Sequence, residues 1–184
     1  MKKTFIKIAG LIMIMMLPRK VKETAEWKRA SGEFSVITVP AAIISLKTFA
    51  KIQKDAEKIL GVEGAAVLLY EAGKDAGKTW ISRFHDEWGL KGAENEFIRA
   101  TEEFYAELGW GKFSIDIKHL TISVENSFIA RGYGKGEAKK PVCHFLCGYN
   151  ASLTTELINK AVDVEERKCM AKGDRYCEFC VVTP

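Results

Sequence analysis

The sequence predicts an α+β fold in which helices pack on a twisted antiparallel sheet. Apolar residues recur with helical spacing over residues 41–60 and again over residues 65–88. The pattern then changes to the alternation of strands over residues 112–118 and 120–130. A further helix and a strand pair follow, and helices segregated from antiparallel strands in this way are typical of α+β domains.

The first predicted elements divide the chain into a helical extension, residues 1–33, and a domain formed by residues 34–184. Residues 18–30 are a polar helix candidate. Residues 34–39 alternate and are rich in β-branched side chains, which indicates a strand. Pro40 follows, and proline suits the first turn of the next helix.

The N-terminus combines a basic start with an apolar run at residues 8–17, which resembles the core of a signal peptide. This run is too short to span a bilayer, and no small-x-small cleavage site follows it. We therefore expect an amphipathic or core-packing helix, or a translation start at Met16. Membrane association through this segment stays open as an alternative.

Residues 65–88 carry Gly73 and Gly77 one helical turn apart. Glycine inside a helix costs about 1 kcal/mol relative to alanine. The pair therefore predicts that another backbone or a ligand approaches this helix face closely. A third helix is expected over residues 93–108.

Residues 131–140 are polar and rich in glycine. No strand-turn-helix frame surrounds them, so we expect a loop and no phosphate site. Residues 141–160 predict a helix, and residues 164–170 and 175–182 predict two strands joined by a short loop.

Composition limits the function classes. The chain has 184 residues, 47% of them apolar, and a formal net charge of +4, so we expect one main domain. Basic and acidic residues are interspersed, which argues against nucleic-acid binding. The 5 cysteines are an odd number. We therefore expect a reducing, cytoplasmic environment and no disulfide framework.

All the cysteines lie near the C-terminus. A three-residue loop at residues 172–174 would place Cys169 across from Cys177, and cross-strand Cβ atoms lie about 4.5–5.5 Å apart. Cys143 would lie in the first helical turn, with Cys147 one turn later. By strand alternation Cys180 faces away from Cys177. A metal site and a set of inert buried thiols both fit this spacing.

The segment PVCHFLCGYN…VEERKCMAKGDRYCEFCVV resembles the C-terminal signature of the 4-vinyl-reductase, or hydrocarbon-binding, domain family. The stretches LLYEAGKDAG, GWGKFSI and VENSFIA resemble its glycine-paired helix and central strands. The likeness covers roughly residues 36–182. It implies the fold of the sensor domains of phenol- and xylene-responsive activators, shared with the Bet-type subunits of the TRAPP tethering complex.

The resemblance also implies a zinc ion held by Cys143, Glu166, Cys169 and Cys177. Strict alternation would put Glu166 and Cys169 on opposite faces of a strand, so a bulge near Arg167 is needed. Without it, Cys147 would be the fourth ligand. Four protein ligands leave no open position, so the zinc is expected to be structural.

The family further implies a homodimer that binds a small apolar or aromatic molecule between helices and sheet. We expect a cavity of several hundred Å³, which is typical of such sites. Its candidate lining is Gly73, Gly77, Phe84, Trp88, Phe104, Tyr105, Trp110 and Phe128. The aromatic sensors tend to carry tryptophan where this chain has Val124, which argues against a phenol-like ligand.

Three functions follow as hypotheses. The first is a ligand-binding or sensor domain without an output module of its own, which would pass its signal to a protein partner. The second is a scaffold or adaptor of the TRAPP type. The third, implied by the family name, is reduction of a vinyl group on a tetrapyrrole. No dinucleotide fingerprint is present for the hydride donor, so an enzyme is not the favoured interpretation.

Overall fold

The computed structural model describes residues 21–182, so the expectations for the apolar run at residues 8–17 lie outside the described residues. Helices and antiparallel strands alternate along the chain as predicted, which confirms the α+β class. In chain order the elements are α2 (Val21–Thr24), β1 (Ala25–Lys28), β2 (Glu33–Val36), β3 (Val39–Pro40), α3 (Leu46–Trp88), α4 (Glu94–Glu107), β4 (Lys112–Asp116), β5 (Thr121–Glu125), α5 (Phe128–Tyr133), α6 (His144–Ile158), β6 (Asp163–Lys168), the 3-10 turn η1 (Met170–Lys172) and β7 (Cys177–Val182).

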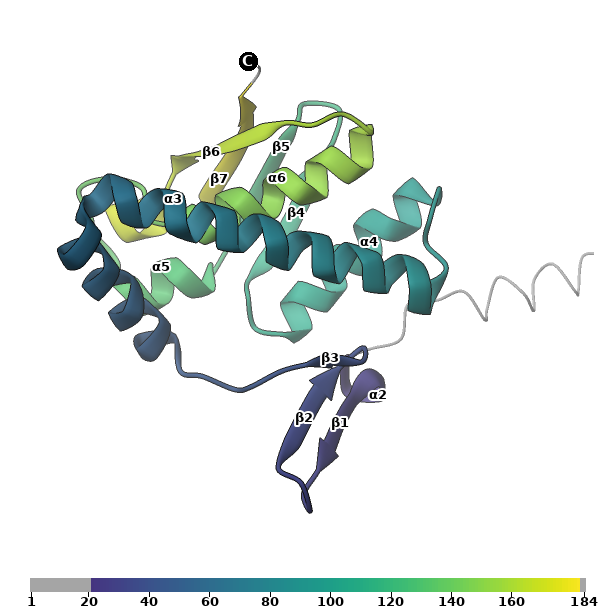
Figure 1. Ribbon diagram of the computed structural model, residues 1–184. Coiled ribbons are helices and arrows are strands. Elements are labelled where there is room, and N and C mark those ends of the chain that lie inside the picture. The colour runs from purple at the N-terminus through teal and green to yellow at the C-terminus, as the bar shows by residue number, and fades with distance from the viewer. Residues whose placement is uncertain (1–20, 183–184) are drawn as a thin grey trace, which may run out of the picture.

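The main sheet has four strands in the order β4-β5-β7-β6, and each neighbouring pair is antiparallel. Helix α6 packs against β6 and β7, and the long helix α3 packs along α6. Figure 1 shows α6 lying across the strands with α3 running beside it. The core therefore consists of the buried face of the sheet, nearly all of α6 and one side of α3.

Helix α3 unites the two helices predicted at residues 41–60 and 65–88. It bends at Gly61, whose φ of 75° and ψ of 162° are not helical. The helix begins after Ser45, because the Ser45 side chain accepts a hydrogen bond from the Thr48 N–H at 3.0 Å. It ends at Gly89, whose φ of 65° suits a left-handed C-cap. Within residues 21–182, neither α3 nor any other helix is long and apolar enough to cross a bilayer.

Glycines allow α3 and α6 to approach each other closely. A Cβ atom at Gly73 would lie 2.0 Å from the carbonyl oxygen of Phe145, and one at Gly148 would lie 1.8 Å from that of Tyr70. A Cβ atom at Gly77 would also meet α6. The close approach predicted from the glycine spacing is therefore that of another helix backbone.

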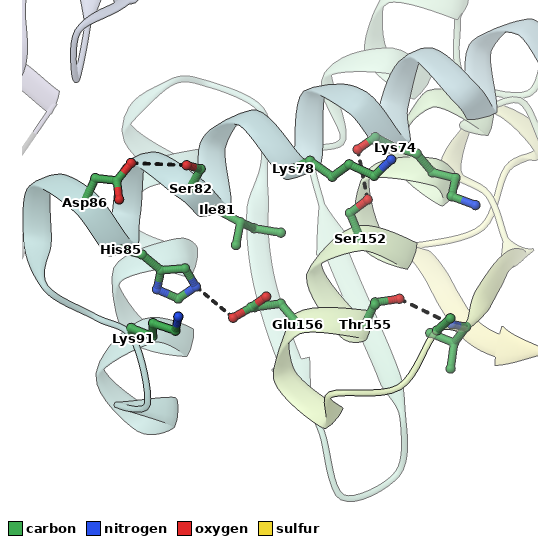
Figure 2. A pocket seen from close by; sticks show the side chains of 12 residues that line it. Lys74, Lys78, Ile81, Ser82, His85, Asp86, Lys91, Ser152, Thr155 and Glu156 are labelled. Carbon is green, nitrogen blue, oxygen red and sulfur yellow. Dashed lines mark hydrogen bonds and ion pairs between the residues drawn. The ribbon is translucent and has the colours of Figure 1, made fainter.

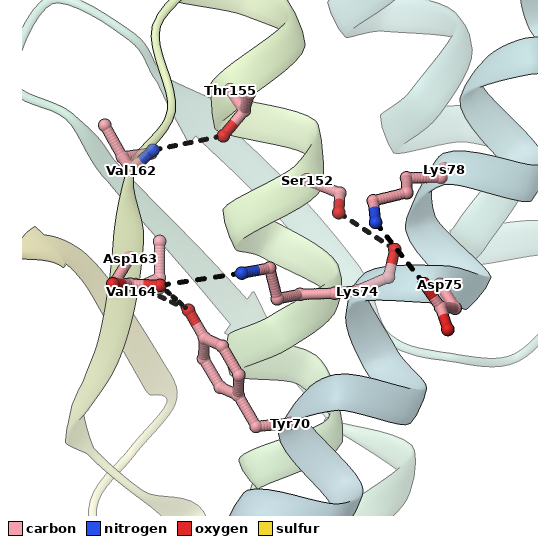
Figure 3. Close-up of polar contacts among 9 residues, drawn as sticks. All are labelled: Tyr70, Lys74, Asp75, Lys78, Ser152, Thr155, Val162, Asp163 and Val164. Atoms are coloured by element: carbon pink, nitrogen blue, oxygen red, sulfur yellow. Dashed lines mark hydrogen bonds and ion pairs between the residues drawn. The ribbon is translucent and has the colours of Figure 1, made fainter.

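Polar contacts hold the same helix pair and the start of β6 together (Figure 3). The Tyr70 hydroxyl donates to Asp163 at 2.8 Å, and Lys74 forms an ion pair with the same carboxylate at 3.8 Å. The Ser152 hydroxyl donates to the carbonyl oxygen of Lys74 at 2.9 Å. These contacts fix the position of α6 on α3 and on the edge strand of the sheet.

The N-terminal hairpin corrects the helix predicted at residues 18–30. Strands β1, β2 and β3 form a separate three-stranded sheet, and only α2 is helical in the described part of this region. Trp27 and Phe34 stand directly opposite each other, with their ring centroids 4.3 Å apart. Such a cross-strand aromatic pair stabilises a hairpin, which explains why the weak helical pattern does not prevail.

The second predicted strand, residues 120–130, ends earlier than expected. Strand β5 stops at Glu125, Asn126 takes a positive φ of 57°, and the Ser127 side chain then caps α5. Residues 128–130 therefore belong to a helix. A left-handed residue followed by an N-cap serine is sufficient to turn the chain out of the sheet.

The connection between β6 and β7 is longer than the three-residue loop predicted at residues 172–174. It contains η1 and then Gly173, whose φ of 111° is open to glycine. The Asp174 carboxylate accepts a hydrogen bond from the Cys169 N–H at 2.8 Å. This bond fixes the backbone on which Cys169 lies.

Candidate metal centre and ligand cleft

Cys143, Glu166, Cys169 and Cys177 meet where the start of α6 approaches the β6–β7 hairpin. Their candidate ligand atoms all lie within 4.8 Å of one another, and all four residues are buried. The family resemblance implied this set of four, and the fold brings together residues up to 34 positions apart. Among residues 21–182, it forms a cluster that could hold a metal ion.

A β-bulge allows Glu166 and Cys169 to face the same point. The β6–β7 register shifts between Glu166 and Lys168, which confirms the irregularity predicted near Arg167. The shift reverses the alternation of side chains, so that both residues turn inward. Cys169 follows the last residue of β6 and Cys177 begins β7, so the hairpin brings their thiols together.

The geometry of the cluster suits a tetrahedral ion. A metal–sulfur bond of about 2.3 Å gives a tetrahedron with an edge of about 3.8 Å. The Sγ atoms of Cys143 and Cys177 are 3.8 Å apart. Glu166 Oε2 accepts a hydrogen bond from the Cys143 N–H at 2.8 Å, whereas the buried Oε1 has no hydrogen-bond partner among the described residues. That oxygen is available as a ligand, and three thiols with one carboxylate favour a thiophilic ion such as zinc.

The electrostatics of the cluster also indicate a cation. Burial, together with the nearby Cys169 thiolate, raises the pKa of Glu166 to about 8. Burial likewise raises the pKa of Cys143 well above its usual value. Hydrogen bonds from Cys143 and Cys177 lower the pKa of Cys169, so this thiol is the first to ionise. A bound cation would stabilise all the anionic forms and remove the penalty of burying them.

Cys147 and Cys180 lie outside this group. Cys147 is on the next turn of α6, and its N–H donates to the carbonyl oxygen of Cys143 at 2.9 Å. Cys180 pairs with Thr121 and Glu165 in the sheet. Burial raises the pKa of both thiols, and both behave as small buried apolar side chains.

An apolar cleft of about 480 Å³ lies between the N-terminal hairpin, the start of α3, the end of α4 and α5. Trp110, Phe128, Phe145 and Phe49 form its aromatic wall. Trp110 and Phe128 have ring centroids 5.1 Å apart, and Phe49 meets Phe128 edge-on at 5.3 Å. The volume is typical of a small-molecule site, and its lining is mainly apolar.

Two of the predicted ligand residues, Trp110 and Phe128, line this cleft. The structure places the other six elsewhere. Gly73 and Gly77 lie at the α3–α6 contact. The remaining four belong to an aromatic core in which at most 9% of any residue is exposed: Phe84, Trp88, Phe104 and Tyr105.

This aromatic core corrects the expected location of the cavity. The rings of Phe84 and Trp88 stack with centroids 4.7 Å apart, and Phe104 meets Phe84 edge-on at 5.1 Å. Side chains therefore fill the space between these helices, and the cleft opens on the other side of Trp110.

Sequence analysis did not single out most of the cleft wall. Phe49, Trp80 and Phe145 contribute rings from α3 and α6, and Trp27 and Phe34 contribute rings from the hairpin. Phe49 lies in the predicted helical pattern, and Phe145 is two residues from Cys143. No single periodic pattern contains them, because they come from distant segments that converge only in the folded chain.

A second cleft, of about 640 Å³, lies between the C-terminal halves of α3 and α6 (Figure 2). Its walls carry Lys74, Lys78, Asp86 and the pair His85 Nε2–Glu156 Oε1, whose atoms are 2.8 Å apart. Burying such groups against an apolar molecule would be unfavourable. The smaller aromatic cleft is therefore the candidate site for an apolar ligand.

Comparison with known sequences identifies the C-terminal part of the chain. Residues 120–183 match the family model of the 4-vinyl-reductase domain. Two uncharacterized proteins of Methanocaldococcus jannaschii are 25% and 27% identical to this chain over 118 and 162 residues, which are 64% and 88% of its length. The matched regions are 65% of the first relative and 80% of the second.

Two solved structures show the same fold. The phenol-responsive sensory domain of the transcription activator PoxR, solved with phenol, has a TM-score of 0.68 at 18% identity over 86% of this chain and 84% of that domain. A vinyl-4-reductase family protein from Methanocaldococcus jannaschii has a TM-score of 0.51 at 18% identity, covering 77% and 83%. A third structure, a trafficking protein particle complex subunit 3 from Naegleria fowleri covalently bound to palmitic acid, has a TM-score of 0.49 at 18% identity, covering 75% and 95%.

The range matched by the family model contains all four clustered residues, Cys143, Glu166, Cys169 and Cys177. The structural match to the PoxR domain extends the likeness over most of the chain. Residues 120–183 thus carry a 4-vinyl-reductase domain, and the chain has the fold of the PoxR sensory domain, as the resemblance to this family predicted.

Proposed function

We propose that this chain is a small-molecule-binding domain that takes an apolar or aromatic ligand in the aromatic cleft. The observation that carries the proposal is the cleft itself, which has about 480 Å³ of space and walls formed by Trp110, Phe128 and Phe145. Polar groups are few along it, with Ser45 and Glu107 at its edge. Such a lining favours a ligand bound chiefly by burial of apolar surface.

The likeness to the PoxR sensory domain supports the same class of ligand, since that domain was solved with phenol. The tryptophan typical of the aromatic sensors is replaced here by Val124, which is fully buried in the core of this chain. A larger or less polar molecule than phenol is therefore the ligand we expect. Mass spectrometry of freshly purified, denatured protein would identify a ligand that remains bound through purification.

The test of the cleft uses a neutral aromatic fluorophore, N-phenyl-1-naphthylamine, and a charge placed in the cleft wall. Ile44 lines the cleft and is 52% exposed, so Ile44→Asp should leave the fold intact. We expect it to abolish the fluorescence increase and the rise in melting temperature that the probe produces, because a ligand of the native state stabilises it.

Ile59→Asp is the matched control, because Ile59 is 80% exposed on α3 and does not line the cleft. It should bind the probe as the unsubstituted chain does. Equal binding by both variants would place the probe outside the cleft and overturn the proposal.

We further propose that Cys143, Glu166, Cys169 and Cys177 hold one structural zinc ion. The proposal is supported by the Sγ–Sγ separation of 3.8 Å and by the unpartnered Glu166 Oε1. Zinc bound there would contribute directly to folding, because its ligands come from three separate elements. Elemental analysis of protein purified without chelator should give one zinc per chain, and a metal-free folded protein would refute the assignment.

A homodimer is the third part of the proposal. Large apolar side chains are exposed on α3 around its bend, at Ile59, Leu60, Val67 and Leu68, with 51–80% of each accessible. Exposed apolar faces of this kind mark contacts with other proteins. Sedimentation analysis should give a dimer, and Leu68→Lys should convert it into a monomer. A monomer before substitution would leave this face to a different protein and favour the adaptor alternative.

A further inference from the structure

The edge of the aromatic cleft exposes large apolar side chains. Trp27 is 61% exposed, Ile43 79% and Ile44 52%, and all three line the cleft. They lie on the hairpin and on the segment that leads into α3. A contiguous exposed patch of this kind normally has an occupant.

The first described residue of the chain is attached at this edge. The Val21 N–H donates a hydrogen bond to Glu107 Oε2 at 2.6 Å, and Glu107 lines the cleft. Val21 also packs on the core. The preceding residues therefore leave the described part of the chain beside the opening of the cleft.

The segment that reaches this point has the matching chemistry. Residues 8–17 contain only apolar side chains and glycine, with three methionines among them. Methionine adapts its shape to irregular apolar surfaces. Leu17 is four residues before Val21, so it lies within about 14 Å of Val21 even when the chain is fully extended.

We propose that residues 8–17 occupy the aromatic cleft of their own chain, and that the small-molecule ligand competes with them. The competition rests on the proposed function, whereas the contact itself does not. A tether this short gives an effective concentration in the millimolar range, which favours the same chain over a second copy. Ligand affinity is reduced in proportion to the time that the cleft is occupied.

The contact is tested by photo-crosslinking in the full chain, with p-benzoylphenylalanine in place of Ile43. An equal mixture of 15N-labelled and unlabelled protein is irradiated, digested and analysed by mass spectrometry. We expect crosslinks to residues 8–17 in which both peptides carry the same label. The same group in place of Ile59, which is exposed on α3 outside the cleft, should not reach that segment. Crosslinks of mixed label, to lipid, or to no part of residues 8–17 would each overturn the proposal.

Competition is tested separately with N-phenyl-1-naphthylamine. Ile12→Asp and Ile14→Asp together should weaken self-occupancy and tighten probe binding roughly tenfold. Thr4→Asp, which adds a charge outside the apolar run, should leave binding unchanged. Equal probe affinity in all three proteins would refute competition. Crosslinking without probe binding in any protein would refute the proposed ligand function and leave the contact established.

Discussion

Gly73→Ala tests whether the paired glycines serve helix packing. The new Cβ atom would lie 2.0 Å from the carbonyl oxygen of Phe145, 2.9 Å from its carbonyl carbon and 3.0 Å from the N atom of Tyr149. All three are backbone atoms, so no change of rotamer relieves the overlap. Ordinary contact begins near 3.4 Å, which requires α3 and α6 to separate by about 1.4 Å.

Overpacking of this kind costs about 1–3 kcal/mol and sometimes more. Replacing glycine by alanine in a helix offsets about 1 kcal/mol of that loss. We therefore expect Gly73→Ala to lower the free energy of unfolding by at least about 2 kcal/mol, measured by urea denaturation with circular dichroism.

Gly64→Ala provides the control in the same helix. Its Cβ atom would meet only the side chain of Leu60, at 3.1 Å, and Leu60 is 51% exposed and free to move. Gly64→Ala should raise stability by about 0.5–1 kcal/mol, because it gains helix propensity without a clash. If Gly73→Ala were as stable as Gly64→Ala, the packing explanation of the glycine pair would be wrong.

Three further predictions concern the metal centre and the caps. Cys169→Ser should lose the zinc and several kcal/mol of stability, whereas Cys147→Ser should keep one zinc per chain, as elemental analysis and thermal melting would show. Zinc affinity should fall as the pH drops below about 8, because Cys143 and Glu166, whose pKa values are raised, must lose protons to bind it; calorimetry in buffers of different ionisation enthalpy should detect proton release, and its absence would show that these groups are already ionised. Ser45→Ala should lower the free energy of unfolding by about 1 kcal/mol by removing the N-cap of α3, and no change in urea denaturation would exclude that role.

The sequence predicted those features that depend on local pattern. Helical spacing located both arms of α3, and strand alternation showed that Glu166 and Cys169 could meet only through a bulge. That bulge was predictable because the side-chain period of a strand is two, and an even alternation could not join these two ligands. The metal ligands themselves came from the family resemblance.

Features that depend on distant contacts were not predictable from pattern. The helix expected at residues 18–30 gave way to a hairpin, in which Trp27 stacks on Phe34. The strand expected up to residue 130 ended at Asn126, whose positive φ leaves no sequence signal beyond the residue type. The cleft was expected among residues on α3 and α4, but its walls are assembled from five separate segments.

The metal centre and the cleft share two pieces of backbone. Phe145 lines the cleft and lies two residues after Cys143 at the start of α6. Phe128 lines it from α5, and the preceding residue, Ser127, places its Oγ 3.6 Å from the Sγ atom of Cys143. A metal ion that fixes Cys143 would therefore also fix both aromatic rings.

Removing the zinc should accordingly weaken ligand binding as well as stability. Couplings between sites are commonly about 1–3 kcal/mol, so chelation should raise the Kd of N-phenyl-1-naphthylamine roughly tenfold, and adding zinc back should restore it. Circular dichroism would show whether the chelated protein stays folded. Should it unfold, Ser127→Ala offers a milder test, because it keeps all four ligands and removes only the contact with Cys143. Probe affinity unchanged both in folded, zinc-free protein and in Ser127→Ala would show that the α6 start holds Phe145 in place without the metal.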